Sequence, residues 1–232
     1  MDFFERYSDA FTGGLIGIIA AILLKNRQIR PMPGDVNIQD FRGQADEKLK
    51  RRESQSGNSF FRKNPRKVSD IDSIVLHQMG FQRGSDPEKY LGVPAHFIVL
   101  PDGTIARLHD FSRYLYTSNG LNSRSIGVEI AGNFPNVNGT WWKPEKFGMD
   151  RPTPEQIEAV KSLIRAVKAE LDAQGVKLRK VFAHRQSSGT KANDPGPDIW
   201  RGVFPVFSEL GLDEAGSFHT GTGKPIPESW VP

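Results

Sequence analysis

Short runs of apolar residues, each bounded by polar or turn-forming positions, predict strands from residue 73 onward. The runs cover residues 73–76, 96–100, 104–107, 126–130 and 180–183. A Pro-Asp-Gly sequence separates the second run from the third and favours a turn, so these two runs are predicted to form a hairpin. The fourth run differs from the others because it carries a carboxylate, Glu129, among apolar neighbours.

The clearest helical pattern begins at Thr153. This residue is suited to be the N-cap, Pro154 to be the first helical residue, and Gln156 to complete a capping box. Gly175 is a residue at which this helix would naturally end. Strands on both sides of a long amphipathic helix predict a layered α/β or α+β domain. The apolar residues that recur at helical spacing are Ile157, Val160, Leu163, Ile164, Val167 and Leu171.

The first part of the chain has a different pattern. Residues 11–24 are mostly apolar but fall short of the roughly 20 residues that a spanning helix needs. Acidic residues precede this segment and basic residues follow it, so a standard signal peptide is not expected. Two interpretations stay open: a helix that packs on the domain or on a partner, and a segment that contacts a membrane or docks into a particle.

Residues 26–67 are rich in Pro, Gly, Gln, Ser and charge without a sustained apolar period, which predicts a linker or extended arm. We therefore place a domain boundary near Val68. The expected organisation is an N-terminal apolar segment and basic linker over 1–67, one folded domain over 68–212 and a C-terminal tail over 213–232. A chain of 232 residues has room for one such domain of about 150 residues with extensions.

Charge and cysteine content narrow the classes of function. The net charge is +4, and a cluster of basic residues in the predicted linker favours either a solvated segment or attraction to anionic polymers or lipids; nucleic acid is not expected as a partner. The absence of cysteine excludes disulfides and thiolate metal sites, so a metal would need His, Asp or Glu ligands. The cluster comprises Lys48, Lys50, Arg51, Arg52, Arg62, Lys63, Arg66 and Lys67.

Three potential metal ligands follow predicted strands. His77 comes directly after the run 73–76, His184 directly after 180–183, and Asp194 ten residues later. A single histidine at a strand end is more often a hydrogen-bonded structural residue. If the two strands are neighbours, however, both imidazoles emerge at one edge of the sheet. Two imidazoles and a carboxylate around an open position are typical of a hydrolytic zinc site.

Five stretches, residues 74–77, 95–105, 125–129, 153–156 and 184–197, together resemble, in the same order, the N-acetylmuramoyl-L-alanine amidase type 2 family. This family includes phage amidase lysozymes and peptidoglycan recognition proteins. The resemblance covers roughly residues 68–212. It implies a central mixed β-sheet flanked by helices, with the N-terminal segment as a helical or extended arm outside it.

The resemblance also implies a site and a reaction. His77, His184 and Asp194 match the three Zn²⁺ ligands, and Glu129 matches the catalytic base. The implied reaction is hydrolysis of the amide between N-acetylmuramic acid and L-alanine in peptidoglycan or muropeptides. Zinc lowers the pKa of a water towards about 7, and Glu129 takes the proton. The implied place of action is the bacterial cell wall, reached through the periplasm, the exterior or a phage or injection particle.

Two positions depart from the family pattern. Relatives usually carry a lysine two residues before the ligand aspartate, where this chain has Ala192, and the nearest lysine is Lys191. A shift of one residue in the loop would return Lys191 to the role of stabilising the oxyanion. Thr117 stands where many relatives have a histidine. Transition-state stabilisation is therefore expected to be arranged differently here.

The remaining candidates have both structural and functional interpretations. His96 matches a position near the site and is expected either to support it or to contact substrate. Trp141 and Trp142 lie in a long loop, where they either stack on sugar or peptide at the cleft wall or pack the loop onto the domain. His109 and His219 match no functional position and are predicted to be surface residues.

Three functions follow from these features. The first is a peptidoglycan amidase, the second a module that binds peptidoglycan without cutting it, and the third a structural or delivery component of a phage or injection particle. Non-catalytic members of the family typically lose a metal ligand. Because all three ligand positions and Glu129 are present here, the catalytic interpretation is favoured.

Overall fold

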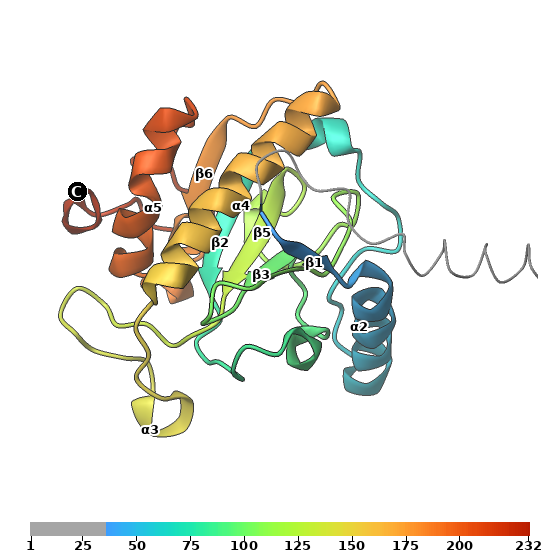
Figure 1. Cartoon of the computed structure of the whole chain (residues 1–232), viewed down its shortest axis with the longest axis horizontal. Coiled ribbons are helices and arrows are strands. Elements are labelled where there is room, and N and C mark those ends of the chain that lie inside the picture. The colour runs from blue at the N-terminus through green and yellow to red at the C-terminus, as the bar shows by residue number, and fades with distance from the viewer. Residues whose placement is uncertain (1–35) are drawn as a thin grey trace, which may run out of the picture. The chain divides into compact units, whose positions relative to one another are not determined.

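The fold is built on one six-stranded sheet, seen in a computed structural model that describes residues 36–232 (Figure 1). The strand order is β1-β4-β3-β5-β2-β6. The five strand runs expected from the sequence correspond to β2 to β6. The strands are β1 (Ile38–Asp40), β2 (Ser73–Gln78), β3 (Phe97–Val99), β4 (Ile105–Arg107), β5 (Ser125–Ile130) and β6 (Lys180–Ala183).

Strand direction makes the sheet mixed, as predicted. β2 runs parallel to both β5 and β6, and β3 runs parallel to β5. β3 and β4 form the expected antiparallel hairpin, and β1 pairs parallel to β4 at the sheet edge. The carboxyl ends of β2, β5 and β6 therefore lie at the same edge, which is where parallel sheets place their ligand sites.

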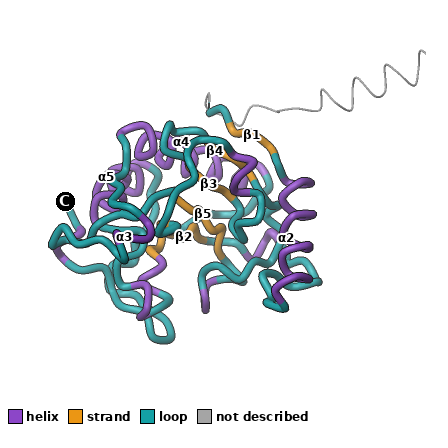
Figure 2. The backbone as a smooth tube through the Cα atoms, turned by 90° about the horizontal axis from the view of Figure 1, so that it is seen from below, coloured by secondary structure: helices purple, strands orange, loops and turns teal. Residues whose placement is uncertain are grey.

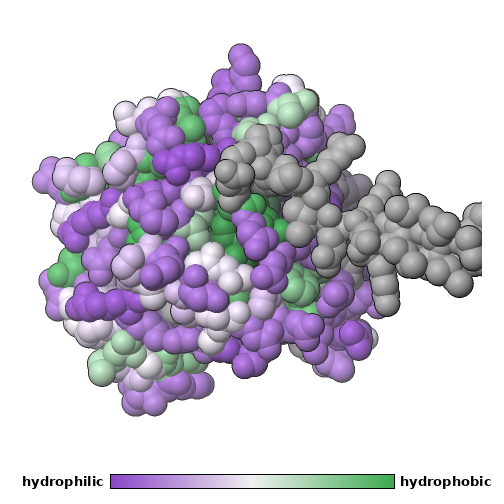
Figure 3. Space-filling view, viewed as in Figure 1, coloured by the Kyte–Doolittle hydropathy of each residue, from purple (hydrophilic) through white to green (hydrophobic). Residues whose placement is uncertain are grey.

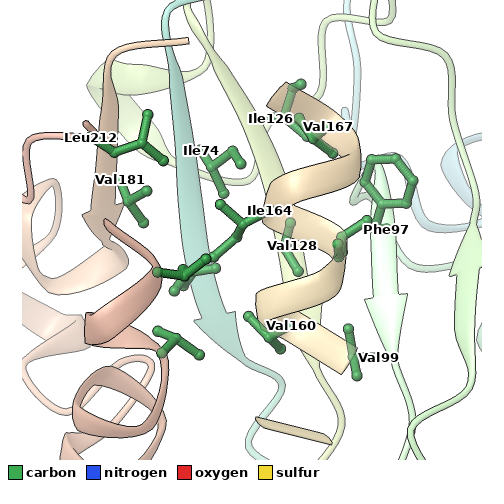
Figure 4. Close-up of a cluster of buried hydrophobic side chains, with 14 of the residues drawn as sticks. Ile74, Phe97, Val99, Ile126, Val128, Val160, Ile164, Val167, Val181 and Leu212 are labelled. Atoms are coloured by element: carbon green, nitrogen blue, oxygen red, sulfur yellow. The ribbon is translucent and has the colours of Figure 1, made fainter. Parts of the chain in front are cut away.

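Two helices, α4 (Pro154–Ala173) and α5 (Pro197–Glu209), cover one face of the sheet. The predicted start of α4 is confirmed: Thr153 and Gln156 form a capping box, and Gly175 follows the end of the helix in a left-handed conformation. Apolar side chains from α4 and the strands form the main core. Those labelled in Figure 4 include Val160, Ile164 and Val167 from α4 and Ile74, Phe97 and Val128 from the sheet.

The opposite face is covered by α2 (Arg42–Ser56) and by loops, as the view in Figure 2 helps to follow. Ala45 of α2 packs with Ile98 of β3 and with the neighbouring β4, while Val75 and Phe182 pack under another group of loop residues. Because successive side chains of a strand point to opposite faces, the strands contribute alternate residues to these clusters.

The structure differs from the expected linker over 26–67. Within the described part, residues 38–56 form β1 and α2, and Arg66, expected in a solvated run, is 9% exposed. The described fold thus begins with β1, well before the boundary placed near Val68. The reason is that α2 buries only Ala45 and Leu49, too few apolar positions to produce a visible helical period. The predicted docking segment 11–24 lies outside the described residues.

The C-terminal segment also differs from the expected tail. It folds back onto the domain and buries Trp230, which is 2% exposed, beside α5. The sequence pattern had not singled out α5, which contains Pro205 within its length. No helix among residues 36–232 is both long and apolar enough to cross a bilayer. The face seen in Figure 3 is mainly hydrophilic outside the atoms drawn in grey.

Candidate metal centre and active site

Three side chains reach one face of the sheet from two adjacent strands and from the turn that follows a third. In the register of β2 and β5, His77 pairs with Glu129, and Leu76 pairs with Ala183 of β6, so that His184 comes one position later. Leu76, Val128 and Ala183 point into the core beneath α4. His77 and Glu129, the next residues of β2 and β5, therefore point the other way. His184 begins a 3₁₀ turn directly after β6, and its ring centroid lies 4.4 Å from that of His77. Strand alternation and the turn after β6 together bring His77, Glu129 and His184 to one place.

Asp194 completes the group. Donor atoms of His77, His184 and Asp194 all lie within 4.8 Å of one another, and all three residues are buried. The Nδ1 atom of His184 is 3.0 Å from Oδ2 of Asp194, while Oδ1 accepts a hydrogen bond of 2.8 Å from the backbone N–H of Gln78. The loop that carries Asp194 is thus tied directly to the end of β2.

These residues fit a zinc ion. Two imidazoles and one carboxylate are a common ligand set for catalytic zinc, which keeps a further position open. Burial, with additional contributions from His184, Lys191 and His96, holds the pKa of His77 well below its usual 6.5. The His77 ring is therefore neutral at pH 7, so no proton competes with a metal for it.

Glu129 contributes a carboxyl group in which one oxygen atom has no hydrogen-bond partner within residues 36–232. Its Oε2 atom is buried and receives no hydrogen bond from the described residues. Burial is the main reason that the pKa of Glu129 rises from 4.5 to about 8, and the negative charge of Asp194 adds to the rise. Such an unpaired carboxyl group in a ligand cluster is typical of an acid or base rather than of a structural residue.

Lys191 lies just before Asp194, in a 3₁₀ turn over Gly189–Lys191, and its carbonyl oxygen accepts a hydrogen bond of 2.9 Å from the Asp194 N–H. The side chain is exposed. Its positive charge is nevertheless close enough to oppose the rise in the pKa of Glu129. Ala192, at the position where relatives carry lysine, is also exposed.

His96 is held in the interior and is 2% exposed. Its Nδ1 atom accepts a hydrogen bond of 3.0 Å from the Gly127 N–H, so in the neutral ring Nε2 carries the proton and donates to the Arg113 carbonyl at 3.1 Å. These contacts favour the structural interpretation. Thr117 lies beside the same strand: a Cβ placed on Gly127 would be 2.8 Å from its Oγ1 atom.

The two tryptophans of the long loop have different surroundings. Trp141 is partly buried, and its Nε1–H donates to the Asp150 carbonyl at 2.7 Å, which packs the loop together. Trp142 is 56% exposed and stacks on Phe147, with ring centroids 4.6 Å apart. Its ring also passes close to Gly80, two residues after β2. Of the two rings, Trp142 is therefore the exposed one, and it lies near the chain segment that follows β2.

His109 is not the surface residue that was predicted. It is 0% exposed, and its Nδ1 atom is 2.6 Å from Oδ1 of Asp46 in α2, so this pair fastens α2 to the domain. The prediction for His219 is confirmed, since that residue is exposed. Sequence reasoning also missed Ser118 and Asn119, which contact the two imidazoles and which no motif or spacing pointed out.

Comparison with known proteins agrees with this arrangement. A family model described as N-acetylmuramoyl-L-alanine amidase matches residues 67–197, a segment that includes all four site residues. No curated protein matches the chain.

Solved structures with similar folds include three kinds of protein. The amidase LysC from Clostridium intestinale has 18% identity and a TM-score of 0.48, covering 76% of this chain and 99% of that one. The peptidoglycan recognition protein SA of Drosophila has 15% identity and a TM-score of 0.47, covering 80% and 98%. The endolysin of Thermus scotoductus bacteriophage Ph2119 has 20% identity and a TM-score of 0.40, covering 76% and 100%.

Proposed function

Because this chain belongs to the N-acetylmuramoyl-L-alanine amidase family, we propose that it uses zinc to hydrolyse the amide bond between N-acetylmuramic acid and L-alanine in peptidoglycan. The observation that supports this most strongly is the convergence of His77, His184 and Asp194 beside the unpaired Oε2 atom of Glu129. The reaction places the protein at the bacterial cell wall.

In this proposal, His77, His184 and Asp194 hold the zinc ion. A bound zinc ion supplies Lewis acidity, which lowers the pKa of a water to about 7 and polarises a carbonyl group. The chain contributes the fixed positions of the three donors: two are anchored by strand ends, and the third by the hydrogen bond from the Gln78 N–H to Asp194.

Glu129 moves the proton. Its Oε2 atom accepts a proton from the attacking water and later returns it to the departing amine of L-alanine. In the metal-free protein, a pKa of about 8 keeps Glu129 mostly protonated at neutral pH. With zinc held by its neighbours, Glu129 would have a lower pKa, and its carboxyl group would serve as a base near neutral pH.

Lys191 stabilises the negative charge that develops on the carbonyl oxygen of the substrate. Its exposed side chain leaves the ammonium group free to reach into the site, and its positive charge opposes the rise in the pKa of Glu129. Trp142 offers an exposed aromatic edge for the sugar or stem peptide. Thr117 and His96 act by supporting the strand that carries Glu129.

A second candidate function is a module that binds peptidoglycan without cutting it. The observation that favours it is the pair of departures at Ala192 and Thr117, both in segments that border the site. The two functions differ in their products, because a binding module retains ligand and zinc but releases no stem peptide.

Digestion of purified peptidoglycan tests the proposal. Wild type, Glu129→Gln and His184→Ala are compared with the exposed-site control Glu47→Gln, with bound zinc quantified and products identified by mass spectrometry. We expect stem peptides beginning at L-alanine from wild type and the control. Glu129→Gln should retain zinc without releasing product, and His184→Ala should lose both. A wild type that binds peptidoglycan and zinc but releases nothing would establish the binding module instead.

A further inference from the structure

Both imidazoles of the proposed zinc site are held from behind by adjacent residues of one loop. Nε2 of His77 is 3.1 Å from Oγ of Ser118, and Nε2 of His184 is 3.0 Å from Oδ1 of Asn119. The two rings lie 4.4 Å apart between their centroids. Because this loop contacts the Nε2 atom of each ring, it can orient both rings.

The chemistry of these partners determines which nitrogen carries the proton. The amide oxygen of Asn119 can only accept, so Nε2 of His184 must be the donor. In the neutral ring, Nδ1 is then an acceptor, yet it lies 3.0 Å from the Asp194 carboxylate, which is also an acceptor. Two acceptors that face each other at this distance are satisfied by a shared cation.

A hydroxyl relay extends from the other ring. Oγ of Ser118 is 2.8 Å from Oγ1 of Thr117 as well as 3.1 Å from Nε2 of His77. Ser118 can accept from the His77 Nε2–H and donate its own proton to Thr117. This direction leaves Nδ1 of His77 unprotonated, and Ser118 itself is fully buried, so no bulk water competes for the bond.

The loop is fixed by its own hydrogen bonds. Oδ1 of Asn122 accepts from the backbone N–H groups of Thr117 at 3.1 Å and of Ser118 at 2.6 Å. The carbonyl of Asn122 in turn accepts from the buried guanidinium of Arg66 at 2.7 Å. Asn119 adopts a left-handed conformation with φ of 51°, which asparagine tolerates better than most residues.

We propose that Ser118 and Asn119 are positioning residues, which hold His77 and His184 in the Nε2–H tautomer so that each presents Nδ1 to the zinc ion. This inference rests on the proposed function, because it assigns the metal to the same site. Outer partners of this kind fix the orientation and basicity of metal-bound histidines in other zinc proteins. Thr117 then belongs to the relay that supports His77.

The test measures two quantities, which are the tautomer of each histidine and the affinity of the protein for zinc. Long-range nitrogen–proton spectra of metal-free protein labelled with ¹⁵N-histidine are recorded at pH 8, where unperturbed histidines are neutral. We expect Nε2–H for His77 in the metal-free protein, and for both His77 and His184 in a second set of spectra with zinc bound, because Nδ1 of His184 faces the Asp194 carboxylate and needs a cation between them. Ser118→Ala and Asn119→Gly should each disturb the tautomer of their own histidine and weaken zinc binding about 10- to 100-fold in chelator competition. Glycine is chosen at Asn119 because it accepts the same backbone conformation.

Ser69→Ala and Asn64→Gly are the matched controls, since both residues are exposed. Their zinc affinity and histidine spectra should equal those of wild type. Nδ1–H of His77 in metal-free wild type, Nδ1–H of either histidine in the zinc-bound protein, or zinc affinities within about twofold of wild type in both loop variants would overturn the positioning role. Failure of wild type to bind zinc would overturn the proposed function and the metal part of this inference. The spectra of metal-free protein would still show whether the loop selects the tautomer of His77.

Discussion

His77 and Glu129 are register partners on the adjacent parallel strands β2 and β5, with their side chains on the same face of the sheet. Neighbouring strands lie about 4.8 Å apart, so a cation held by His77 would lie beside the Glu129 carboxyl group. Neither strand can shift by one residue without moving its side chains to the other face. In the proposed function, the sheet itself would therefore couple metal binding to the protonation of Glu129.

The first prediction is that zinc binding releases a proton from Glu129. With a pKa of about 8 in the metal-free protein, Glu129 is mostly protonated at pH 7, and the arriving positive charge favours the carboxylate. Titration calorimetry in buffers of different ionisation enthalpy should show about one proton more released by wild type than by Glu129→Gln.

The pH dependence follows from the same shift. Because the protonated form must lose a proton when zinc binds, the apparent zinc affinity should rise with pH between about 6 and 8 and gain little from Glu129 above that range. Glu47→Gln, an exposed-site control, should behave as wild type. Equal proton release from wild type and Glu129→Gln would contradict this prediction.

The second prediction concerns Lys191. Lys191→Ala should reduce hydrolysis by about 10-fold or more without changing zinc affinity greatly, because it removes a donor to the developing oxyanion. In the double variant Lys191→Ala with Ala192→Lys, the ammonium group returns at the position that relatives use, and activity should recover in part. Lys177→Ala, at an exposed position after α4, serves as the control. No loss in Lys191→Ala would remove this residue from the mechanism.

Much of the site could be predicted because its signals are local. His77 and His184 each end an apolar run, and Thr153 begins α4 with a capping box that depends on three neighbouring positions. Alternation along a strand then places Glu129 and His77 on one face once their pairing is known. The pairing itself joins distant segments, and here the family resemblance supplied it.

The parts that escaped prediction depend on distant contacts. His109 is buried because Asp46, 63 residues away, meets it from α2. β1 has three residues and forms by pairing with β4. No sequence pattern marks Ser118 and Asn119, because the path of their loop determines where their side chains point. In each case tertiary contacts override a weak or absent local signal.

The third prediction is a loss of stability in mild acid that involves His96. Burial, with help from the nearby charge of Arg66, holds the pKa of His96 well below 6.5, so the folded protein keeps this ring neutral. Below about pH 6.5 the unfolded chain gains a proton at His96 that the folded chain does not. The free energy of unfolding should therefore fall by up to about 1.4 kcal/mol for each pH unit from this group.

Urea unfolding at pH 8, 6 and 5 measures this slope. His96→Gln should show a shallower decline than wild type, whatever its stability at pH 8. His219→Gln, at an exposed position, should decline as steeply as wild type. Identical slopes for wild type and His96→Gln would show that the ring is protonated in the folded state.

The fourth prediction is that the C-terminal segment supports His184. The backbone N–H groups of Thr220 and Lys224 donate to the carbonyls of Gln186 and Arg185, both at 2.8 Å. A Cβ on Gly223 would overlap the Gln186 carbonyl, so Gly223→Ala should displace this segment and weaken zinc binding. Trp230→Ala should lower the free energy of unfolding by about 3–5 kcal/mol.

The half-exposed neighbour Val231 provides the comparison for Trp230. Val231→Ala should change stability by less than about 0.5 kcal/mol, as is usual for surface sites. Calorimetric zinc titration of Gly223→Ala measures the effect on the site. Wild-type zinc affinity in that variant would mean that the C-terminal segment packs on the domain without positioning His184.

The last prediction compares deletion of residues 1–30 with deletion of residues 1–66, which also removes β1 and α2. Deleting residues 1–66 removes Leu49, which is fully buried, and Arg66, whose guanidinium donates to the carbonyls of Phe111, Asn122 and Ser125. Three buried acceptors would lose their partner, each at a cost of about 1–3 kcal/mol, and the loss of Leu49 adds to that.

A chain without residues 1–66 should therefore unfold at a markedly lower urea concentration than a chain without residues 1–30, with a difference on the order of 5 kcal/mol or more. It should also bind zinc more weakly, because Asn122 and Arg66 hold the loop of Ser118 and Asn119. The shorter deletion still removes residues 11–24, so it is the one that tests a role of this segment in delivery. Equal stability of the two chains would mean that the domain begins near Val68 after all.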